Sequence, residues 1–258
     1  MSYLLILVLA AALVYFLFFR RKKANCVIDK PGINYFELLD ASVPFYKHLD
    51  LNEKNRFEKR VREFFGEVRI EGVGTEVTDV DRVLIAASAV IPIFGFPKWR
   101  YRNLTNVILY PDTFDGEFQF EGGRRNILGM VGSGYMNGQM LLSRAALVKG
   151  FSASSGRENT AIHEFVHLLD KSDGATDGLP SNLQPPSYAE PWLHLMHVEM
   201  HRISAGKSDI NPYALTNEAE FFAVAAEYFF EKPRELHQKH PDLYASLSQI
   251  FAQDPAGH

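Results

Sequence analysis

The chain begins with a long apolar run that carries no charged side chain. Residues 1–19 form this run, and residues 20–23 after it are all basic. A helix of that length measures about 28 Å, close to the hydrocarbon thickness of a bilayer. The pattern predicts a transmembrane helix, with the lipid bilayer as a partner of residues 1–19. The positive-inside rule then predicts a single-pass membrane protein with its C-terminal domain in the cytoplasm.

A cleaved signal peptide is the alternative for the same residues. It requires basic residues before the apolar run and small residues at a cleavage site after it, whereas here the basic residues come second. If the segment is removed nonetheless, the protein is exported and its mature N-terminus lies beyond about residue 20.

Beyond the basic cluster the pattern becomes that of a folded domain. Residues 24–48 contain two prolines and a glycine and are interpreted as a linker. Residues 50–68 carry apolar side chains at spacings near three, four and seven, which predicts an amphipathic helix. A second, buried helix is predicted after an N-cap at Thr78 or Asp79 and is expected to stop before Pro92.

A short β-branched run at residues 106–111 predicts a strand, and residues 138–143, GQMLLS, are interpreted as another strand. Glycine is frequent between residues 114 and 138. Loops and edge strands are therefore expected there, including the alternating segment 117–122.

The composition narrows the class of function. The chain has 258 residues, of which 47% are hydrophobic and 22% charged, enough for a substantial core. Its formal net charge of -4 provides no basic field for a phosphate backbone, so no nucleic-acid partner is expected. The single cysteine, Cys26, excludes a disulfide within the chain.

Candidate chemistry lies in the segment HEFVHLLD, residues 163–170. On a helix His163 and His167 lie on one face, so both imidazoles can bind one metal ion. Glu164 projects from a neighbouring angle and can act as general base on a water without being a ligand. This is the H-E-x-x-H arrangement of zinc peptidases. A histidine pair inside an ordinary helical core is the alternative, but burying these polar groups is costly without a partner.

A catalytic zinc ion needs a third protein ligand. Residues 213–233 form a predicted helix that begins after Thr216 or Asn217 and stops at Pro233. It offers Glu218, Glu220 and Glu227 as candidates, and the residues alone leave the choice open. Glu220 and Glu227 share a face, whereas Glu218 points elsewhere; Glu218 and Glu231 are expected on the solvated surface.

A second histidine cluster carries less weight. His194, His197 and His201 can share one face of a helix. No carboxylate or cysteine cluster accompanies them, so an ordinary packed helix is the better interpretation.

The two segments HEFVHLLD and YALTNEAEFFAVAAEYFF resemble the Mlc titration factor A family of bacterial zinc peptidases. They are also similar to the catalytic domain of anthrax toxin lethal factor. NVILYPDTF and GQMLLSRAALVKGF extend the resemblance to the titration factor family over roughly residues 50–258. In that pattern Glu220 is the third ligand and Tyr213 a phenol facing the zinc, and Asp170 supports the ligands from behind.

The resemblance implies a zincin-like α+β fold, with two metal-bearing helices over a small mixed sheet. It implies one Zn²⁺ per chain and a gluzincin-type peptidase in which Glu164 activates the zinc-bound water. Aminopeptidase-like activity on a peptide or protein substrate is expected, and a transcriptional repressor is a further partner. With the transmembrane segment, the expected domains are residues 1–23 as anchor, 24–48 as linker and 49–258 as peptidase, at a bacterial inner membrane.

A binding module is the competing interpretation. In it, zinc holds the fold and the protein sequesters a transcriptional regulator at the membrane with little peptidase activity. Three ligands and a base favour catalysis, because a purely structural zinc site normally has four protein ligands.

Overall fold

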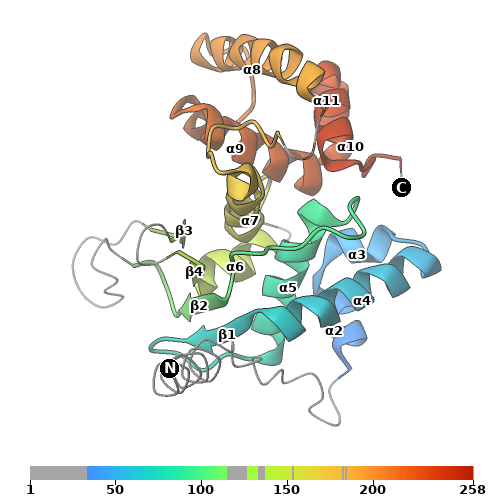
Figure 1. The fold of residues 1–258 in the computed structure, drawn as a ribbon, viewed down its shortest axis with the longest axis vertical. Coiled ribbons are helices and arrows are strands. Elements are labelled where there is room, and N and C mark those ends of the chain that lie inside the picture. Colours follow the sequence, from blue (N-terminus) through green and yellow to red (C-terminus); the bar gives the residue numbers. More distant parts are fainter. Residues whose placement is uncertain are drawn as a thin grey trace, which may run out of the picture.

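The computed structural model describes residues 34–114, 127–132, 137–152, 154–181, 183 and 185–257. Figure 1 shows helix α7 (Thr160–Asp170) in the middle of the molecule. The C-terminal helices lie on one side of it, and the sheet and the N-terminal helices lie on the other (Figure 1). Helix α7 contacts helices from both sides as well as the edge of the sheet. Residues of this helix are therefore in position to join groups from both halves.

The sheet has four strands in the order β1-β2-β4-β3. Strands β1 (Arg69–Gly72), β2 (Asn106–Tyr110) and β4 (Gln139–Ser143) run parallel, and β3 (Gly129–Val131) pairs antiparallel with β4. The two strands expected at residues 106–111 and 138–143 are β2 and β4, and β3 is an edge strand in the glycine-rich region. Strand β1 was not predicted. The expected segment 117–122 lies outside the described residues. This mixed sheet with helices packed on it confirms the predicted α+β class.

Two of the early helices have the expected amphipathic or apolar pattern. Helix α4 (Leu51–Glu67) buries Phe57, and helix α5 (Asp79–Ile93) is buried along most of its length. The N-cap of α5 is Thr78, whose side chain accepts a hydrogen bond from Asp81 N. The predicted stop before Pro92 is wrong: this proline is buried in the last turn, and the helix ends one residue later. Pro92 has no N–H to donate to the carbonyl of Ser88, and the helix continues for only one residue beyond it.

The described part of the expected linker is helical. Residues 35–48 form α2 (Tyr35–Ser42) and α3 (Pro44–His48), and Leu39 is fully buried in the core. Pro44, which suggested an irregular segment, occupies the first turn of α3, where a missing N–H costs nothing.

The remaining helices follow α6 (Arg144–Gly150) along the chain. They are α7, α8 (Ala189–Ser204), α9 (Glu218–Glu231), α10 (Pro233–Lys239) and α11 (Pro241–Phe251), with short 3₁₀ turns at Lys171–Asp173, Pro186–Tyr188 and Pro212–Leu215. Aromatic rings join the C-terminal helices: Phe222 stacks on Phe251 with ring centroids 5.6 Å apart.

The predicted localisation needs correction. In the part of the chain that the structure describes, no helix is long and apolar enough to cross a bilayer, so a single-pass membrane protein is not supported. The predicted span, residues 1–19, lies outside the described residues. That prediction used the apolar run and the basic residues after it, and an apolar run spans a membrane only if it also forms a helix of sufficient length.

Candidate metal centre

Helix α7 presents the H-E-x-x-H residues at the centre of the molecule. Its N-cap is Asn159, whose side chain accepts a hydrogen bond from Ile162 N. Phe165 and Leu169 are fully buried, so the helix is fixed against the core. His163 and Glu164 are each only 8% exposed, and polar groups buried to that extent require partners.

Helix α9 brings a carboxylate to the two histidines. Asn217 caps this helix and accepts from Glu220 N at 2.9 Å, which places Glu220 in the first turn. Phe221 and Phe222 behind it are fully buried. Because α9 packs directly on α7, the position of Glu220 is set by the core and not by a loop.

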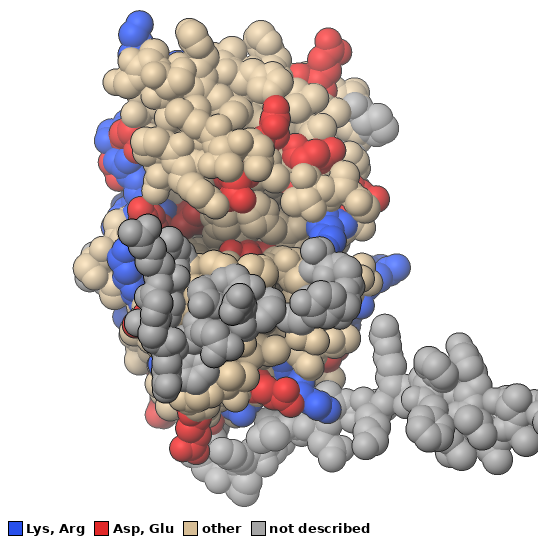
Figure 2. Space-filling view, turned by 90° about the vertical axis from the view of Figure 1, so that its left-hand side faces the viewer, with Lys and Arg blue, Asp and Glu red and all other residues tan. Residues whose placement is uncertain are grey.

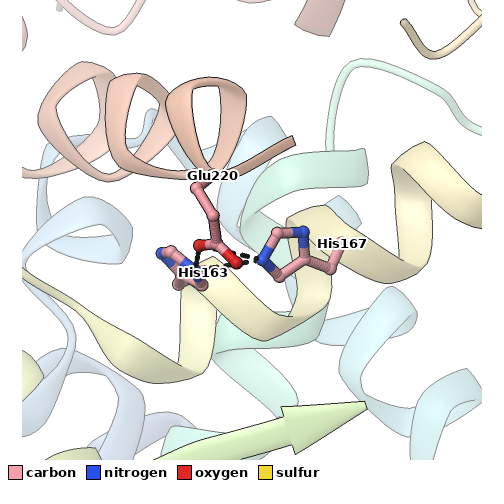
Figure 3. Close-up of side chains that lie close together, drawn as sticks. All are labelled: His163, His167 and Glu220. Atoms are coloured by element: carbon pink, nitrogen blue, oxygen red, sulfur yellow. Dashed lines mark hydrogen bonds and ion pairs between the residues drawn. The ribbon is translucent and has the colours of Figure 1, made fainter. Parts of the chain in front are cut away.

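Three ligand atoms converge between the two helices (Figure 3). His163 Nε2 lies 3.1 Å from His167 Nε2 and 3.0 Å from Glu220 Oε2. His167 Nε2 lies 3.5 Å from the same carboxylate oxygen. Nitrogen and oxygen ligands held tetrahedrally at about 2.1 Å from a zinc ion are about 3.4 Å apart. The triangle therefore has the size that such an ion requires. Among the described residues this is the only group of side chains with a metal-ligand arrangement.

The hydrogen bonding of His163 also fits a cation at this point. Nδ1 lies 2.7 Å from Glu227 Oε1, and a carboxylate can only accept, so Nδ1 carries the hydrogen. In the neutral ring, Nε2 then presents a lone pair to a Glu220 oxygen that also has only lone pairs to offer. Two acceptors at 3.0 Å repel each other unless a positive charge lies between them. A metal ion bound here would supply that charge.

The pKa values of these groups reflect the same preference for positive charge. Burial lowers the pKa of His163, but hydrogen bonds to Glu220 and Glu227 outweigh it and raise the value to about 10. Hydrogen bonds from His163 and His167 hold the pKa of Glu220 well below its usual range. Protons and metal ions compete for such a site, and a metal ion replaces the proton on binding.

Glu227 lies behind the site and holds His163 in place. Besides the imidazole, it accepts a hydrogen bond from Asn159 N at 2.5 Å, so it joins α9 to the N-terminus of α7. The residues alone left Glu227 as a candidate ligand; the structure places it on the far side of the His163 ring. Glu231, expected on the surface, is instead partly buried and accepts from Asn159 Nδ2 at 2.8 Å. Burial raises the pKa of Glu231 to about 7.

Glu164 lies against the edge strand. A Cβ atom added to Gly129 would come within 2.7 Å of Glu164 Cγ and 2.8 Å of Oε1. Strand β3 can approach this closely only because residue 129 has no side chain. Burial raises the pKa of Glu164, which makes its carboxylate a better proton acceptor.

Tyr213 lies on the rim of the site. The residue is 53% exposed, and the centroid of its ring lies 6.1 Å from that of the His163 ring. Burial, with the nearby Glu220 and Glu164 carboxylates, raises the pKa of the phenol, so it keeps its proton. The group at the centre opens onto a cavity of about 410 Å³. Figure 2 shows this side of the molecule, hollowed between the C-terminal helices and the sheet, with acidic side chains in the hollow.

Asp170 is buried but does not bond to a ligand. Its Oδ2 accepts from Gly178 N at 2.9 Å, and a Cβ atom on Gly178 would lie 2.5 Å from Glu218 O. Asp170 therefore fixes a loop that packs against the first turn of α9, the turn that carries Glu220. Within the described residues, Asp170 Oδ1 and His167 Nδ1 have no hydrogen-bond partner. Burial raises the pKa of Asp170 to about 6.

The second histidine cluster does not form a metal site in the described part of the chain. His197 lies 3.2 Å from Glu218, and both side chains are exposed. Glu218 is thus a surface residue, as expected. Sequence reasoning missed Gly129 and the orienting role of Glu227; for Glu227 a signal existed, since it lies seven residues after Glu220 on the same helix face.

Known proteins are similar in sequence to this chain over most of its length. Residues 19–252 match the family model described as glucose-regulated metallo-peptidase M90. Mlc titration factor A of Klebsiella pneumoniae is 28% identical over 227 residues, covering 83% of this chain and 84% of that protein. Mlc titration factor A of Escherichia fergusonii is 29% identical with the same coverage. An uncharacterized protein of Synechocystis sp. is 28% identical over 84% of this chain and 83% of its own length. The chain therefore belongs to the Peptidase_M90 family of metallopeptidases.

Proposed function

We propose that this protein is a zinc-dependent peptidase that binds one Zn²⁺ through His163, His167 and Glu220. The observation that carries the proposal is the convergence of three ligand atoms at 3.0, 3.1 and 3.5 Å beside an open cavity and a buried glutamate. A structural zinc site normally has four protein ligands, whereas three ligands leave one position for a reacting molecule. A metal supplies Lewis-acid chemistry there, acidifying water and polarising a carbonyl.

The other steps fall to side chains of the chain itself. Glu164 accepts a proton from the water that attacks the scissile carbonyl and then donates it to the leaving amine. Tyr213, which keeps its proton, donates a hydrogen bond to the oxygen on which negative charge develops. Glu227 keeps the hydrogen of His163 on Nδ1 and so directs Nε2 to the metal.

The edge strand is placed to hold an extended peptide. Leu128 O and Gly132 N bond to β4, so with the alternation of an antiparallel ladder Gly129 and Val131 direct their backbone groups to the free edge. A peptide that pairs with this edge runs past Glu164 and the metal ligands. Backbone pairing of this kind requires the peptide to be extended but depends little on which side chains the peptide carries.

Binding of a transcriptional regulator is the second candidate function. It rests on the name of the relatives, Mlc titration factor A, which points to the Mlc repressor as their partner. The two functions separate in a Glu164→Gln variant, because a repressor-binding role does not need the proton acceptor. Full regulator binding without hydrolysis, together with unchanged cellular function, would favour this second candidate.

Removing the metal tests the proposal directly. Treatment with a chelator such as EDTA is expected to abolish hydrolysis of a peptide library, and added Zn²⁺ should restore it. The melting temperature should fall on metal removal, because an ion that binds only the folded state stabilises it. Metal content measured by mass spectrometry must follow the activity. Hydrolysis that persists in fully metal-free protein would contradict the proposal.

Gly129→Ala is expected to lower kcat by about a hundredfold while leaving the fold intact. The new methyl group would displace the Glu164 carboxylate, and a misplacement of about 1 Å can cost that much in rate. The atoms in its way are the end of a flexible side chain, so the melting temperature should hardly change. The control is the double variant with Glu164→Gln: because both changes act on one carboxylate, adding Gly129→Ala should cost little further.

A further inference from the structure

A second and larger cavity opens beside the metal centre. Its volume is about 890 Å³, and its walls come from the segment Phe96–Leu104, the C-terminal end of α7 and the far end of strand β3. The segment after α5 carries no helix or strand and reaches across to α7, where Leu168 faces it from the other wall. None of the proposed metal ligands lines this cavity.

The charged side chains that line this cavity are all basic. Lys98, Arg100, Arg102 and Lys171 line it, and none of the lining residues is acidic. The chain as a whole has a net charge of -4, so the basic side chains are concentrated here against the overall balance. A cavity lined by one sign of charge concentrates its field and attracts ligands of the opposite sign.

Within the part of the chain that the structure describes, most of these cations have no acidic partner. Arg100 forms ion pairs with Glu63 and Glu67. For Lys98, Arg102 and Lys171, by contrast, no acidic side chain among the described residues lies within ion-pair distance. Lys98 and Arg102 are exposed, and Lys171 donates only to the carbonyl oxygen of Gly132 at 3.3 Å. Three cations are thus free to bind an anionic group.

The basic cavity adjoins the metal centre. Lys171 lines both spaces. On the strand, Val131 lines the metal cavity and the next residue, Gly132, lines the basic one. On α7, His167 lines the metal cavity and the next residue, Leu168, lines the basic one. A peptide paired with the free edge of β3 is therefore led from the metal centre into the basic cavity within one or two residues.

We propose that this basic cavity is a specificity subsite that binds a carboxylate of the peptide substrate. The inference rests on the proposed peptidase function. Lys98, Arg102 and Lys171 would make charge-assisted hydrogen bonds to the carboxylate, and Trp99 and Leu168 would contact the apolar part of the same residue. The carboxylate belongs either to an acidic side chain near the scissile bond or to the free C-terminus of a short peptide.

Matched peptides distinguish these two sources. One series carries Glu or Gln at each position on either side of the scissile bond, and the other ends in a free acid or an amide. The expected result is that kcat/KM is about tenfold higher for the charged member of at least one pair. A preference confined to Glu over Gln identifies a side-chain subsite, and one confined to acid over amide identifies C-terminal recognition. Equal kcat/KM in every pair would overturn the inference.

Charge variants connect the preference to the cavity. Lys98→Gln/Arg102→Gln should reduce the charged-to-neutral ratio of kcat/KM about tenfold, and Lys98→Glu/Arg102→Glu should shift the preference to peptides with Lys at that position. Lys171 is left intact because it also lines the metal cavity. The matched control, Lys59→Gln/Lys207→Gln, removes two exposed cations elsewhere and should keep the wild-type ratio. A misfolded protein cannot produce a reversed preference.

A binding measurement separates failure of this inference from failure of the proposed function. Fluorescent acidic and neutral peptides are titrated into the Glu164→Gln protein, where no turnover is required. Tighter binding of the acidic peptide that weakens with salt and is lost in the Lys98→Gln/Arg102→Gln background supports the subsite. If wild-type protein cleaves peptides but neither rate nor binding depends on their charge, only the subsite is wrong. If no peptide is cleaved or bound, the peptidase function and the subsite fail together.

Discussion

Replacing Glu164 by glutamine is expected to abolish peptide hydrolysis and to leave the bound metal in place. The amide has nearly the shape of the carboxylate and fits against Gly129 in the same way, but it cannot take a proton from the attacking water. General acid–base catalysis is typically worth 10²- to 10⁴-fold, so kcat should fall by about a thousandfold. Steady-state kinetics on a cleaved peptide, with metal content measured on the same sample, would show both halves of the result.

The control for this variant is Glu190→Gln, an equal change at an exposed glutamate on α8. It should retain wild-type kinetics. A Glu164→Gln protein that still cleaves at the wild-type rate would remove Glu164 from the mechanism. Loss of metal in that variant would instead show that Glu164 acts as a ligand.

Glu220→Ala is expected to remove both the metal and the activity. The change deletes one of three ligands and leaves His163 Nε2 and His167 Nε2 facing each other at 3.1 Å without a carboxylate. Zinc affinity should therefore fall by more than the tenfold to hundredfold that is typical for residues behind the ligands. Competition with a chromophoric zinc chelator measures the affinity, and circular dichroism checks the fold.

Substitutions of two other glutamates of α9 provide comparisons for the zinc affinity of Glu220→Ala. Glu227→Gln removes the acceptor of the His163 Nδ1 hydrogen bond but no ligand, so zinc affinity should fall by about tenfold to a hundredfold. Glu218→Ala changes an exposed residue of the same first turn as Glu220 and should have no effect on affinity. If Glu227→Gln proved worse than Glu220→Ala, the third ligand would be Glu227.

Prediction of the site from sequence was most specific for the two histidines, because their spacing along one helix decides their geometry. His163 and His167 are four positions apart, which puts both imidazoles on one face of α7 whatever surrounds the helix. The choice among Glu218, Glu220 and Glu227 could not be made in this way, because it depends on the rotation of α9 against α7. The family pattern pointed to Glu220, and the packing of the two helices brings Glu220 to the imidazoles and turns Glu218 to the surface.

Sequence reasoning was weaker for parts of the fold that depend on distant contacts. Residues 35–48 looked like a linker, yet they form two helices that bury Leu39 in the core. Strand β1 has a single buried residue, Ile70, and so lacks the alternation that marks longer strands. The membrane assignment was inferred from hydropathy and the position of the basic residues, and it is not supported by the described structure.

By itself, the sequence determined the elements whose cause is local: the two helix N-termini to within one residue, at Thr78 or Asp79 and at Thr216 or Asn217, the apolar periodicity of residues 50–68, and the pair of histidines one turn apart. These depend on backbone hydrogen bonds and on side chains within a few residues of each other. Only the tertiary structure decided which distant residues lie beside these elements: Glu227 behind His163, Gly129 against Glu164, and a cavity whose basic side chains come from two segments about seventy residues apart in the chain. Such contacts depend on how helices and sheet pack, which no short stretch of residues determines on its own.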